Sequence, residues 1–336
     1  MRFAEILDQY HAIGLLRSAL RTGRVHHAYL FTGPSGTGRR ETAWAFAQAL
    51  QCERYAEDAC GGCLPCQKSE RRVHPDIRWI EPLEGRQGIG IDQIRELRQE
   101  AAYGPYEGNY RVYIVTPAER LLPEAQHALL KLLEEPPPRT VFLLVAESPH
   151  ALLPTVVSRT QVVRFNLVPA ADIERALRVQ FEVPPARARV LAALCAGRSA
   201  LAARWAQDPD ALADRDRVVG WLGRVEQGGL LAALEAAESL AQDRDRLQEL
   251  LDIALLWYRD VLVERHAGDD RLVVNLDRRE EIRRLAARLP PEAIHRRLEA
   301  IERAKAELRR NVQPRLALEA MFLQFQLHPA STAPSV

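Results

Sequence analysis

The chain has 336 residues, of which 47% are hydrophobic and 27% charged, a composition typical of ordinary soluble proteins with more than one domain. Its 46 basic and 45 acidic side chains leave a formal net charge of +1, which excludes nucleic-acid binding driven by bulk positive charge. No uncharged apolar run is long enough to cross a membrane, and the amphipathic N-terminus lacks the apolar core of a secretory signal. We therefore expect a cytoplasmic protein without a membrane partner.

The first half of the chain alternates short apolar runs with amphipathic stretches. Apolar runs bounded by helical patterns indicate a parallel sheet covered on both faces, within an α/β domain over residues 1–166. The expected strands cover residues 28–31, 77–80, 112–115, 141–145 and 162–165, and the expected helices cover 2–22, 41–50, 91–102 and 123–135.

After residue 167 the pattern is helical throughout, with prolines that separate the helices. We expect a small helical domain at 167–207 and a larger helical domain at 208–328. The last segment, 329–336, is small and polar, and a disordered tail is expected there. The predicted fold class is therefore α/β followed by all-α.

A glycine-rich turn at residues 33–38 follows a predicted strand and opens a predicted helix, the setting of a G-x-x-x-x-G-K-[ST] phosphate loop. Gly33, Gly36 and Gly38 keep the turn, but Arg39 and Arg40 replace the phosphate-binding lysine and the hydroxyl that ligates Mg²⁺. Backbone N–H groups there can still hold an anion, whereas Arg40 places a positive charge where the metal would sit. We expect no productive Mg·ATP binding. A glycine-rich turn unrelated to nucleotides is the alternative.

The strand expected at 112–115 shows a second departure from an active nucleotide site. In a hydrolysing P-loop protein this strand ends in Asp, often followed by Glu, which hold Mg²⁺ and polarise water. Here the chain continues with Thr116 and Pro117. Because both parts of the metal-binding apparatus are missing, the sequence argues against ATP hydrolysis.

Four of the five cysteines, Cys52, Cys60, Cys63 and Cys66, lie close together in the sequence. Four thiolates are the ligand set of a closed, structural zinc site, and Gly61-Gly62 supplies the flexible backbone that successive ligands need. We therefore predict a structural zinc module at about 52–66. Free thiols or a redox pair are the alternatives.

The chain carries seven segments, at residues 27–38, 52–66, 74–76, 90–97, 126–137, 158–160 and 311–319. Together they resemble the clamp-loader AAA+ family, and most closely its delta-prime type of bacterial DNA polymerase III subunit. The resemblance implies a RecA-like AAA+ domain with a zinc insertion, a helical lid and a C-terminal helical collar for oligomerisation. Motor subunits of the family share most of these segments, so the assignment to the delta-prime type depends on the degenerate nucleotide site. The seven matching segments run along the chain in the family's order.

The resemblance also implies a role for the Ser-Arg-Thr segment at 158–160. In the family it faces the ATP site of the neighbouring subunit, so Arg159 would be an arginine finger in trans and Ser158 would help to position it. A guanidinium there stabilises charge on the transferring phosphoryl group. An arginine paired within its own domain is the alternative.

The partners implied by the resemblance are gamma/tau-type motor subunits and a delta-type subunit in a heteropentameric ring. Such a ring uses ATP to open the sliding clamp and place it on primed DNA. Two other functions stay open at this point: an ATP-hydrolysing motor subunit with an unusual phosphate loop, and a zinc-bearing DNA-binding module.

Overall fold

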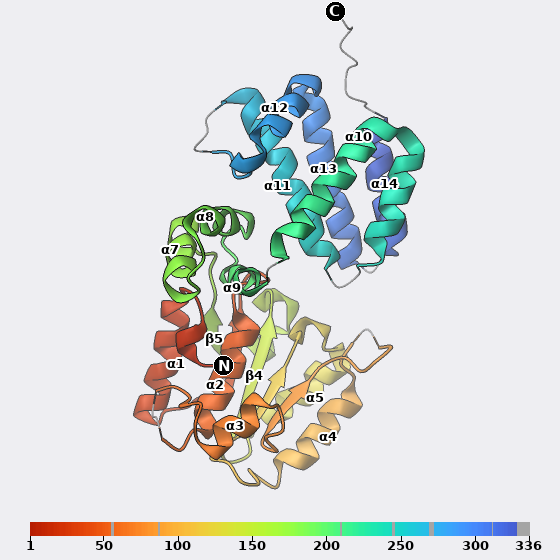
Figure 1. The fold of residues 1–336 in the computed structure, drawn as a ribbon. Helices are drawn as coiled ribbons and strands as arrows, with labels where there is room; N and C mark the ends of the chain where they lie inside the picture. Colours follow the sequence, from red (N-terminus) through yellow and green to blue (C-terminus); the bar gives the residue numbers. More distant parts are fainter. Residues whose placement is uncertain are drawn as a thin grey trace, which may run out of the picture. The chain divides into compact units, whose positions relative to one another are not determined.

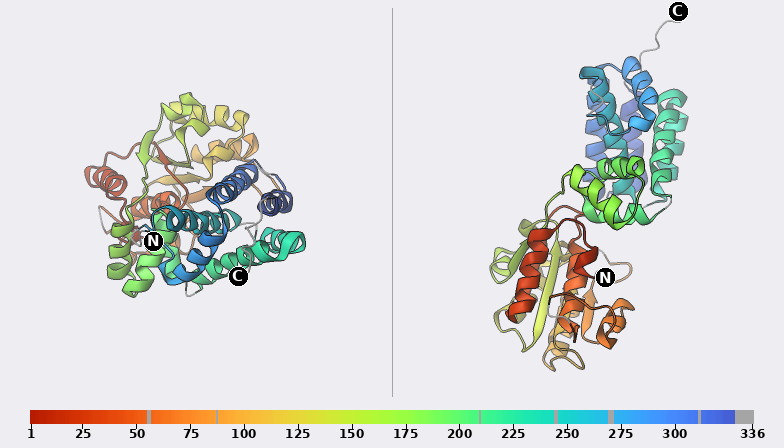
Figure 2. Two further views of the ribbon diagram at one scale, coloured as in Figure 1. Left: turned by 90° about the horizontal axis from the view of Figure 1, so that it is seen from above. Right: turned by 60° about the vertical axis from the view of Figure 1, so that its left-hand side comes forward.

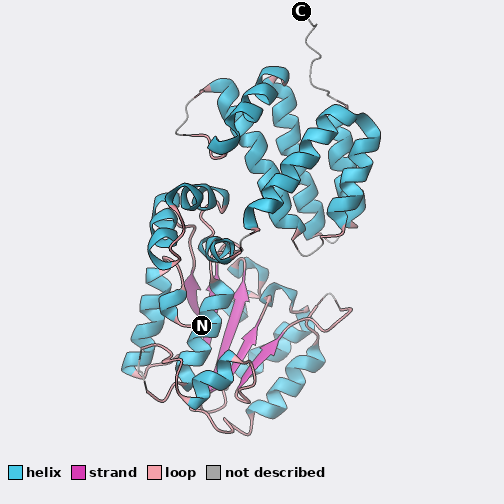
Figure 3. Ribbon diagram, in the orientation of Figure 1, coloured by secondary structure: helices cyan, strands magenta, loops and turns pink. Residues whose placement is uncertain are grey.

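The computed structural model describes residues 1–54, 57–86, 88–208, 210–243, 246–268, 272–310 and 312–327. It divides into two compact units, Met1–Arg204 and Trp205–Val336. All strands of the described residues lie in the first unit (Figures 1 and 3). The predicted fold class, α/β followed by all-α, is confirmed. The tail predicted at 329–336 lies outside the described residues.

Five parallel strands form the sheet of the first unit, in the order β2-β3-β4-β1-β5. Each strand lies within one residue of its predicted bounds. Because the strands are parallel, the loops that follow β1, β3 and β4 meet at one edge of the sheet, where ligand sites of such folds lie. The strands are β1 (Ala28–Thr32), β2 (Ile77–Ile80), β3 (Arg111–Val115), β4 (Thr140–Ala146) and β5 (Gln161–Arg164).

Helices cover both faces of this sheet, and the side chains of each strand alternate between the faces. On one face Tyr29 and Phe31 of β1 pack in a cluster with residues of α1 (Tyr10–Thr22) and α2 (Arg39–Gln51). On the other face Leu30 packs with residues of α4 (Ile91–Ala101) and α5 (Pro123–Glu134). The central strands β1 and β4 are continuous apolar runs because they are buried on both sides. The short elements of this region are α3 (Leu64–Glu70), α6 (Pro154–Val157), η1 (Phe3–Glu5), η2 (Ala118–Arg120) and η3 (Pro149–Ala151).

One helix differs from the prediction. The sequence pattern predicts a single helix over 2–22, whereas the structure has the 3-10 turn η1 followed by α1. Asp8, between them, has a φ of 49°, a left-handed conformation that a continuous helix does not contain.

Three helices follow the sheet in the region predicted as a lid: α7 (Ala170–Gln180), α8 (Pro185–Leu194) and α9 (Ser199–Gln207). Cys195, at the end of α8, is fully buried, and its Sγ donates to the carbonyl oxygen of Ala192 at 3.1 Å. The boundary between the two compact units falls inside α9. A separate lid domain at 167–207 therefore stays a prediction.

The second unit occupies the region predicted as the collar. Its apolar core runs through all of its long helices, which Figure 2 shows packed side by side in green-blue to blue. α10 bends at Gly229, whose φ of 66° interrupts the helix. No described helix is long and apolar enough to cross a membrane. The elements are α10 (Ala211–Ala241), α11 (Leu247–His266), η4 (Leu276–Arg278), α12 (Arg279–Arg288), α13 (Pro291–Arg309) and α14 (Pro314–Gln326).

Candidate functional site

The glycine-rich turn joins the carboxyl end of β1 to the amino end of α2, as a phosphate loop does. Gly33 has a φ of 148°, and a Cβ there would lie 2.2 Å from the carbonyl oxygen of Phe165, so only glycine fits. In the described part of the chain, the N–H groups of Gly36, Thr37 and Gly38 donate to no backbone acceptor. The turn therefore keeps the backbone geometry of an anion-binding loop at a helix N-terminus.

Arg39, at the position of the phosphate-binding lysine, is buried and feels the charges of three carboxylates, those of Glu147, Glu119 and Glu41. It is only 9% exposed, and burial lowers its pKa while the charges of Glu147 and Glu119 act in the opposite direction. Burial raises the pKa of Glu119, and the charge of Glu147 raises it further. Oε2 of Glu119 is buried without a hydrogen-bond partner among the described residues. Acidic side chains thus lie beside the loop that would otherwise receive phosphate groups.

The Arg40 guanidinium contacts two side chains of its own domain, Glu81 and Trp79. Its Nη2 lies 2.7 Å from Oε1 of Glu81, and its guanidinium carbon lies 4.8 Å from the centre of the Trp79 ring. The sequence predicts a positive charge at the magnesium position, and in the structure this charge has a carboxylate partner just beyond β2. The hydroxyl ligand for Mg²⁺ is missing in either case.

The end of β3 carries no carboxylate at the two positions that would serve a metal ion. Thr116 is buried, and its N–H donates to the carbonyl oxygen of Ile80 at 3.0 Å. Pro117 follows it and begins the turn into η2, which contains Glu119. The acidic group near the loop therefore comes from a different position than in a hydrolysing site.

The N-terminus of α9 lies directly on the glycine-rich turn. The carbonyl oxygen of Gly36 accepts a hydrogen bond from the N–H of Ala200 at 2.9 Å, and that of Thr37 accepts one from Oγ of Ser199 at 3.3 Å. A Cβ at Gly36 would lie 3.2 Å from the Cβ of Arg198. These contacts hold the glycine-rich turn against the N-terminus of α9.

Arg159 lies between α6 and β5, the strand at one edge of the sheet. Its Nη2 is 2.8 Å from Oε1 of Glu134, and its side chain is 35% exposed. Its Nη1 donates to the carbonyl oxygen of Thr155 at 3.0 Å and, with a longer distance of 3.4 Å, to Oγ of Ser158. Arg159 is thus paired within its own domain but remains accessible from outside.

The four clustered cysteines converge on one point. Their Sγ atoms all lie within 4.8 Å of one another, and those of Cys60 and Cys66 are 3.9 Å apart. Burial raises the pKa of Cys60, but N–H donors of Gly62 and Cys63 outweigh it and lower the pKa to about 6. Zn–S bonds of about 2.3 Å place tetrahedral thiolates about 3.8 Å apart, so this donor set fits one zinc ion. The ligands would be Cys52, Cys60, Cys63 and Cys66.

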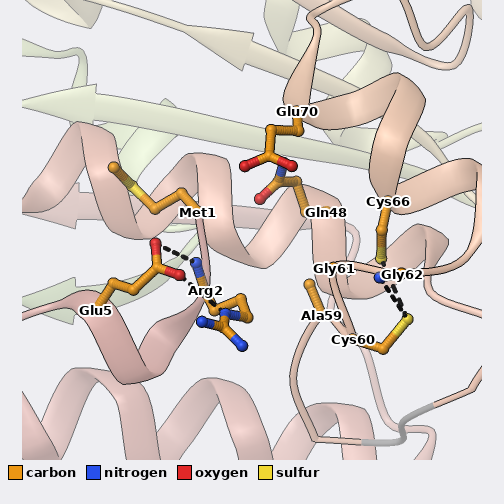
Figure 4. Close-up of a pocket in the computed structure, with 10 residues that line it drawn as sticks. All are labelled: Met1, Arg2, Glu5, Gln48, Ala59, Cys60, Gly61, Gly62, Cys66 and Glu70. Atoms are coloured by element: carbon orange, nitrogen blue, oxygen red, sulfur yellow. Dashed lines mark hydrogen bonds and ion pairs between the residues drawn. The ribbon is translucent and has the colours of Figure 1, made fainter.

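A cavity of about 390 Å³ lies beside the cysteine cluster (Figure 4). The N-terminal segment forms one side of it, and Asp58 ties this segment to the cysteine module. Oδ1 of Asp58 accepts hydrogen bonds from the N–H groups of Phe3 at 3.0 Å and Ala59 at 2.7 Å. The module therefore anchors the start of the chain. The cavity is lined by Met1, Arg2, Glu5, Gln48, Ala59, Cys60, Gly61, Gly62, Cys66 and Glu70.

Two family models match the chain: "DNA polymerase III, delta subunit" over residues 8–169, and "DNA polymerase III, delta subunit, C terminal" over residues 210–326. A DNA polymerase III subunit delta' from Bacillus subtilis is 28% identical over 95% of this chain and 96% of its own length. The chain belongs to the delta-prime family of DNA polymerase III subunits.

This delta-prime family member is also similar to gamma/tau subunits. The DNA polymerase III subunit gamma/tau of Mycobacterium tuberculosis is 31% identical over 99% of this chain, which spans 62% of the length of that relative. Among solved structures, a DNA polymerase III gamma subunit-related protein from Thermotoga maritima aligns with 96% of this chain and 99% of its own. The TM-score of that alignment is 0.43, and the sequence identity is 19%.

Sequence reasoning missed three acidic residues. The charges of Glu119 and Glu147 act on Arg39 of the phosphate loop, and Glu134 forms an ion pair with Arg159. A usable signal existed for the first two, because each follows a strand whose carboxyl end meets the phosphate loop at the same edge of the sheet. Glu134 gave no such signal, since its pairing depends on how α5 packs against α6.

Proposed function

We propose that this chain is a clamp-loader subunit of DNA polymerase III that does not hydrolyse ATP and that supplies Arg159 to the ATP site of a neighbouring subunit. One observation carries the proposal: the chain's own nucleotide site lacks its metal-binding groups, while an accessible arginine lies at the edge of the same sheet. Such a subunit completes a neighbour's site without having a working one.

The chain's own site supports the first half of this proposal in three ways. Thr116 and Pro117 provide no carboxylate to hold Mg²⁺ or to polarise water. The Arg40 guanidinium is paired with Glu81 and supplies no hydroxyl ligand. The charge of Arg39 interacts with those of Glu147 and Glu119 of its own chain, which lowers the positive potential available to a nucleotide. The backbone of the loop alone is left to hold an anion.

The position and chemistry of Arg159 support the second half. The side chain of Arg159 precedes an edge strand, is 35% exposed and is held by a partly exposed carboxylate, an ion pair of a kind that contributes little stability. A guanidinium stays charged at any physiological pH and offers a planar set of donors to phosphoryl oxygens. In GTPases an arginine finger raises the rate by roughly 10³–10⁵-fold.

The partners follow from the family. We propose that the chain works in a heteropentameric ring with gamma/tau-type motor subunits and a delta-type subunit, and that the ring loads the sliding clamp on primed DNA. The second unit, at the position of the collar, would hold the ring together. The cysteine module would bind zinc as a structural ion, worth roughly 10–16 kcal/mol of apparent binding energy in small zinc modules.

The test is to replace Arg159 with Ala in a loader reconstituted from all of its subunits. We expect clamp loading and ATP hydrolysis at the adjoining site to fall by about 10³-fold. Arg95→Ala is the matched control, because this arginine of α4 is 62% exposed and, among the described residues, pairs only with Asp92 of its own helix. Full activity of the Arg159→Ala complex would show that the finger assignment is wrong. ATP turnover by the purified chain alone would instead favour a motor subunit.

A further inference from the structure

Arg159 is held by a carboxylate from another helix. Glu134 is the last residue of α5, and its Oε1 lies 2.8 Å from Nη2 of Arg159. The two side chains are 48% and 35% exposed, respectively. A long and flexible arginine side chain at a surface samples many rotamers unless a partner restrains it. This carboxylate therefore limits the directions in which the guanidinium can point.

The contacts of Arg159 leave donors free for another ligand. A guanidinium has five N–H hydrogens. Glu134 engages Nη2, while the carbonyl oxygen of Thr155 and Oγ of Ser158 both lie near Nη1. Nε–H and one hydrogen of Nη2 are not used by these contacts. The arginine is thus restrained on one side and available to phosphoryl oxygens on the other.

A different side chain joins α5, which carries Glu134, to the start of α6, which precedes Arg159. Gln126, buried in α5, donates from Nε2 to the carbonyl oxygen of Leu121 at 3.1 Å. Its Oε1 accepts the N–H of Leu153, which directly precedes α6, at 2.8 Å. Removal of the Glu134 carboxylate therefore leaves the connection between α5 and α6 in place, and its effect should be confined to the guanidinium.

We propose that Glu134 is a positioning residue for Arg159, an inference that rests on the proposed function in trans. Glu134 orients the free guanidinium before the subunits meet, so that less conformational freedom is lost when Arg159 reaches the neighbour's nucleotide. Because both side chains are partly exposed, the ion pair is weak enough to yield to the more highly charged triphosphate. Glu134 orients the finger without trapping it.

The experiment uses Glu134→Ala and Glu134→Gln in the reconstituted loader. An orientation effect acts on the transition state, so we expect kcat for ATP to fall by about tenfold in Glu134→Ala while KM stays unchanged. Glu134→Gln keeps an oxygen acceptor and should lose less. The matched control is Glu135→Ala, because this neighbour is exposed and forms no ion pair within the described residues.

A double-variant comparison separates positioning from other roles. In an Arg159→Ala background, Glu134→Ala should cause no further loss, because it acts only through the arginine. An equal loss in both backgrounds, or a kcat that is unchanged or raised by Glu134→Ala alone, would overturn the positioning role while leaving the finger in place. A silent Arg159→Ala variant would instead overturn the proposed function itself.

Discussion

The second unit contains a buried ion pair whose disruption should be costly. The side chains of Arg297 and Glu226 are 1% and 4% exposed. Nε and Nη2 of Arg297 donate to Glu226 at 2.6 and 2.9 Å, and Nη1 donates to the carbonyl oxygen of Ala293 at 3.0 Å. The hydroxyl of Tyr258 donates to the same carboxylate at 2.6 Å. The network thus links α10, α11 and α13.

Arg297→Met should lower the stability of this unit by about 3–5 kcal/mol, the range seen when one partner of a buried pair is removed. The buried Glu226 would lose its cationic partner and, among the described residues, keep only the Tyr258 hydroxyl as a donor. Burial and the charge of Glu226 raise the pKa of Tyr258 well above its ordinary value, so this hydroxyl stays protonated and cannot compensate for a lost cation. Most of the cost is therefore the uncompensated charge.

Hydrogen exchange of α10 and α13 in the full chain is the suitable assay, because it reports the second unit separately from the first. We expect exchange to accelerate by roughly 10²–10⁴-fold in Arg297→Met, as follows from the free-energy loss. Adding Glu226→Gln removes the stranded charge and keeps an acceptor for Tyr258, so the double variant should regain part of the loss. A loss below about 1 kcal/mol, typical of surface pairs, or a double variant no better than the single one, would refute this reasoning.

Three further predictions concern the first unit. Asp76→Asn should cost about 2–4 kcal/mol in denaturant unfolding, because the buried carboxylate accepts three N–H groups of residues 106–108. Burial raises the pKa of Asp76, but these hydrogen bonds outweigh it and hold the pKa below its ordinary value. The stabilisation is thus present at neutral pH and lost as pH falls below about 4, so acid unfolding should be shallower in the variant. One zinc per chain should be released by a mercurial reagent, and Cys60→Ser should reduce the amount bound; a metal-free purified chain would contradict the module. Calorimetric titration of the chain with Mg·ATP should show neither binding nor turnover, and a clear binding isotherm would contradict the degenerate site.

The sequence predicted features that depend on local spacing. The five strands were found because each contains a short apolar run. In the central strand β1 the run is buried on both faces, so that Leu30 and Phe31 are both buried although they face opposite sides. The glycine-rich turn and the four cysteines were found because their members lie within a few residues of one another. The converging Sγ atoms agree with the spacing from which the zinc module was predicted.

Features that depend on strand order and helix packing were not predicted. Glu147 reaches the phosphate loop because β4 lies beside β1 in the sheet, although the two strands are far apart in the sequence. The partner of Arg40, Glu81, follows β2 at the opposite edge from β5. The break in the first helix lies at the extended Ile6 and the left-handed Asp8, and the apolar pattern reveals neither conformation.

Burial distinguishes the two arginines on which the proposed function depends. Arg39 is 9% exposed, and its charge interacts with acidic residues of its own chain, Glu147 and Glu119 among them. The side chain of Arg159 is 35% exposed and is held by one partly exposed carboxylate, so exchanging that carboxylate for a phosphate costs little. The two arginines are therefore suited to different roles. Arg39 interacts with acidic residues of its own chain, whereas Arg159 is accessible to a neighbouring subunit. The Arg159→Ala and Mg·ATP experiments test these two roles separately.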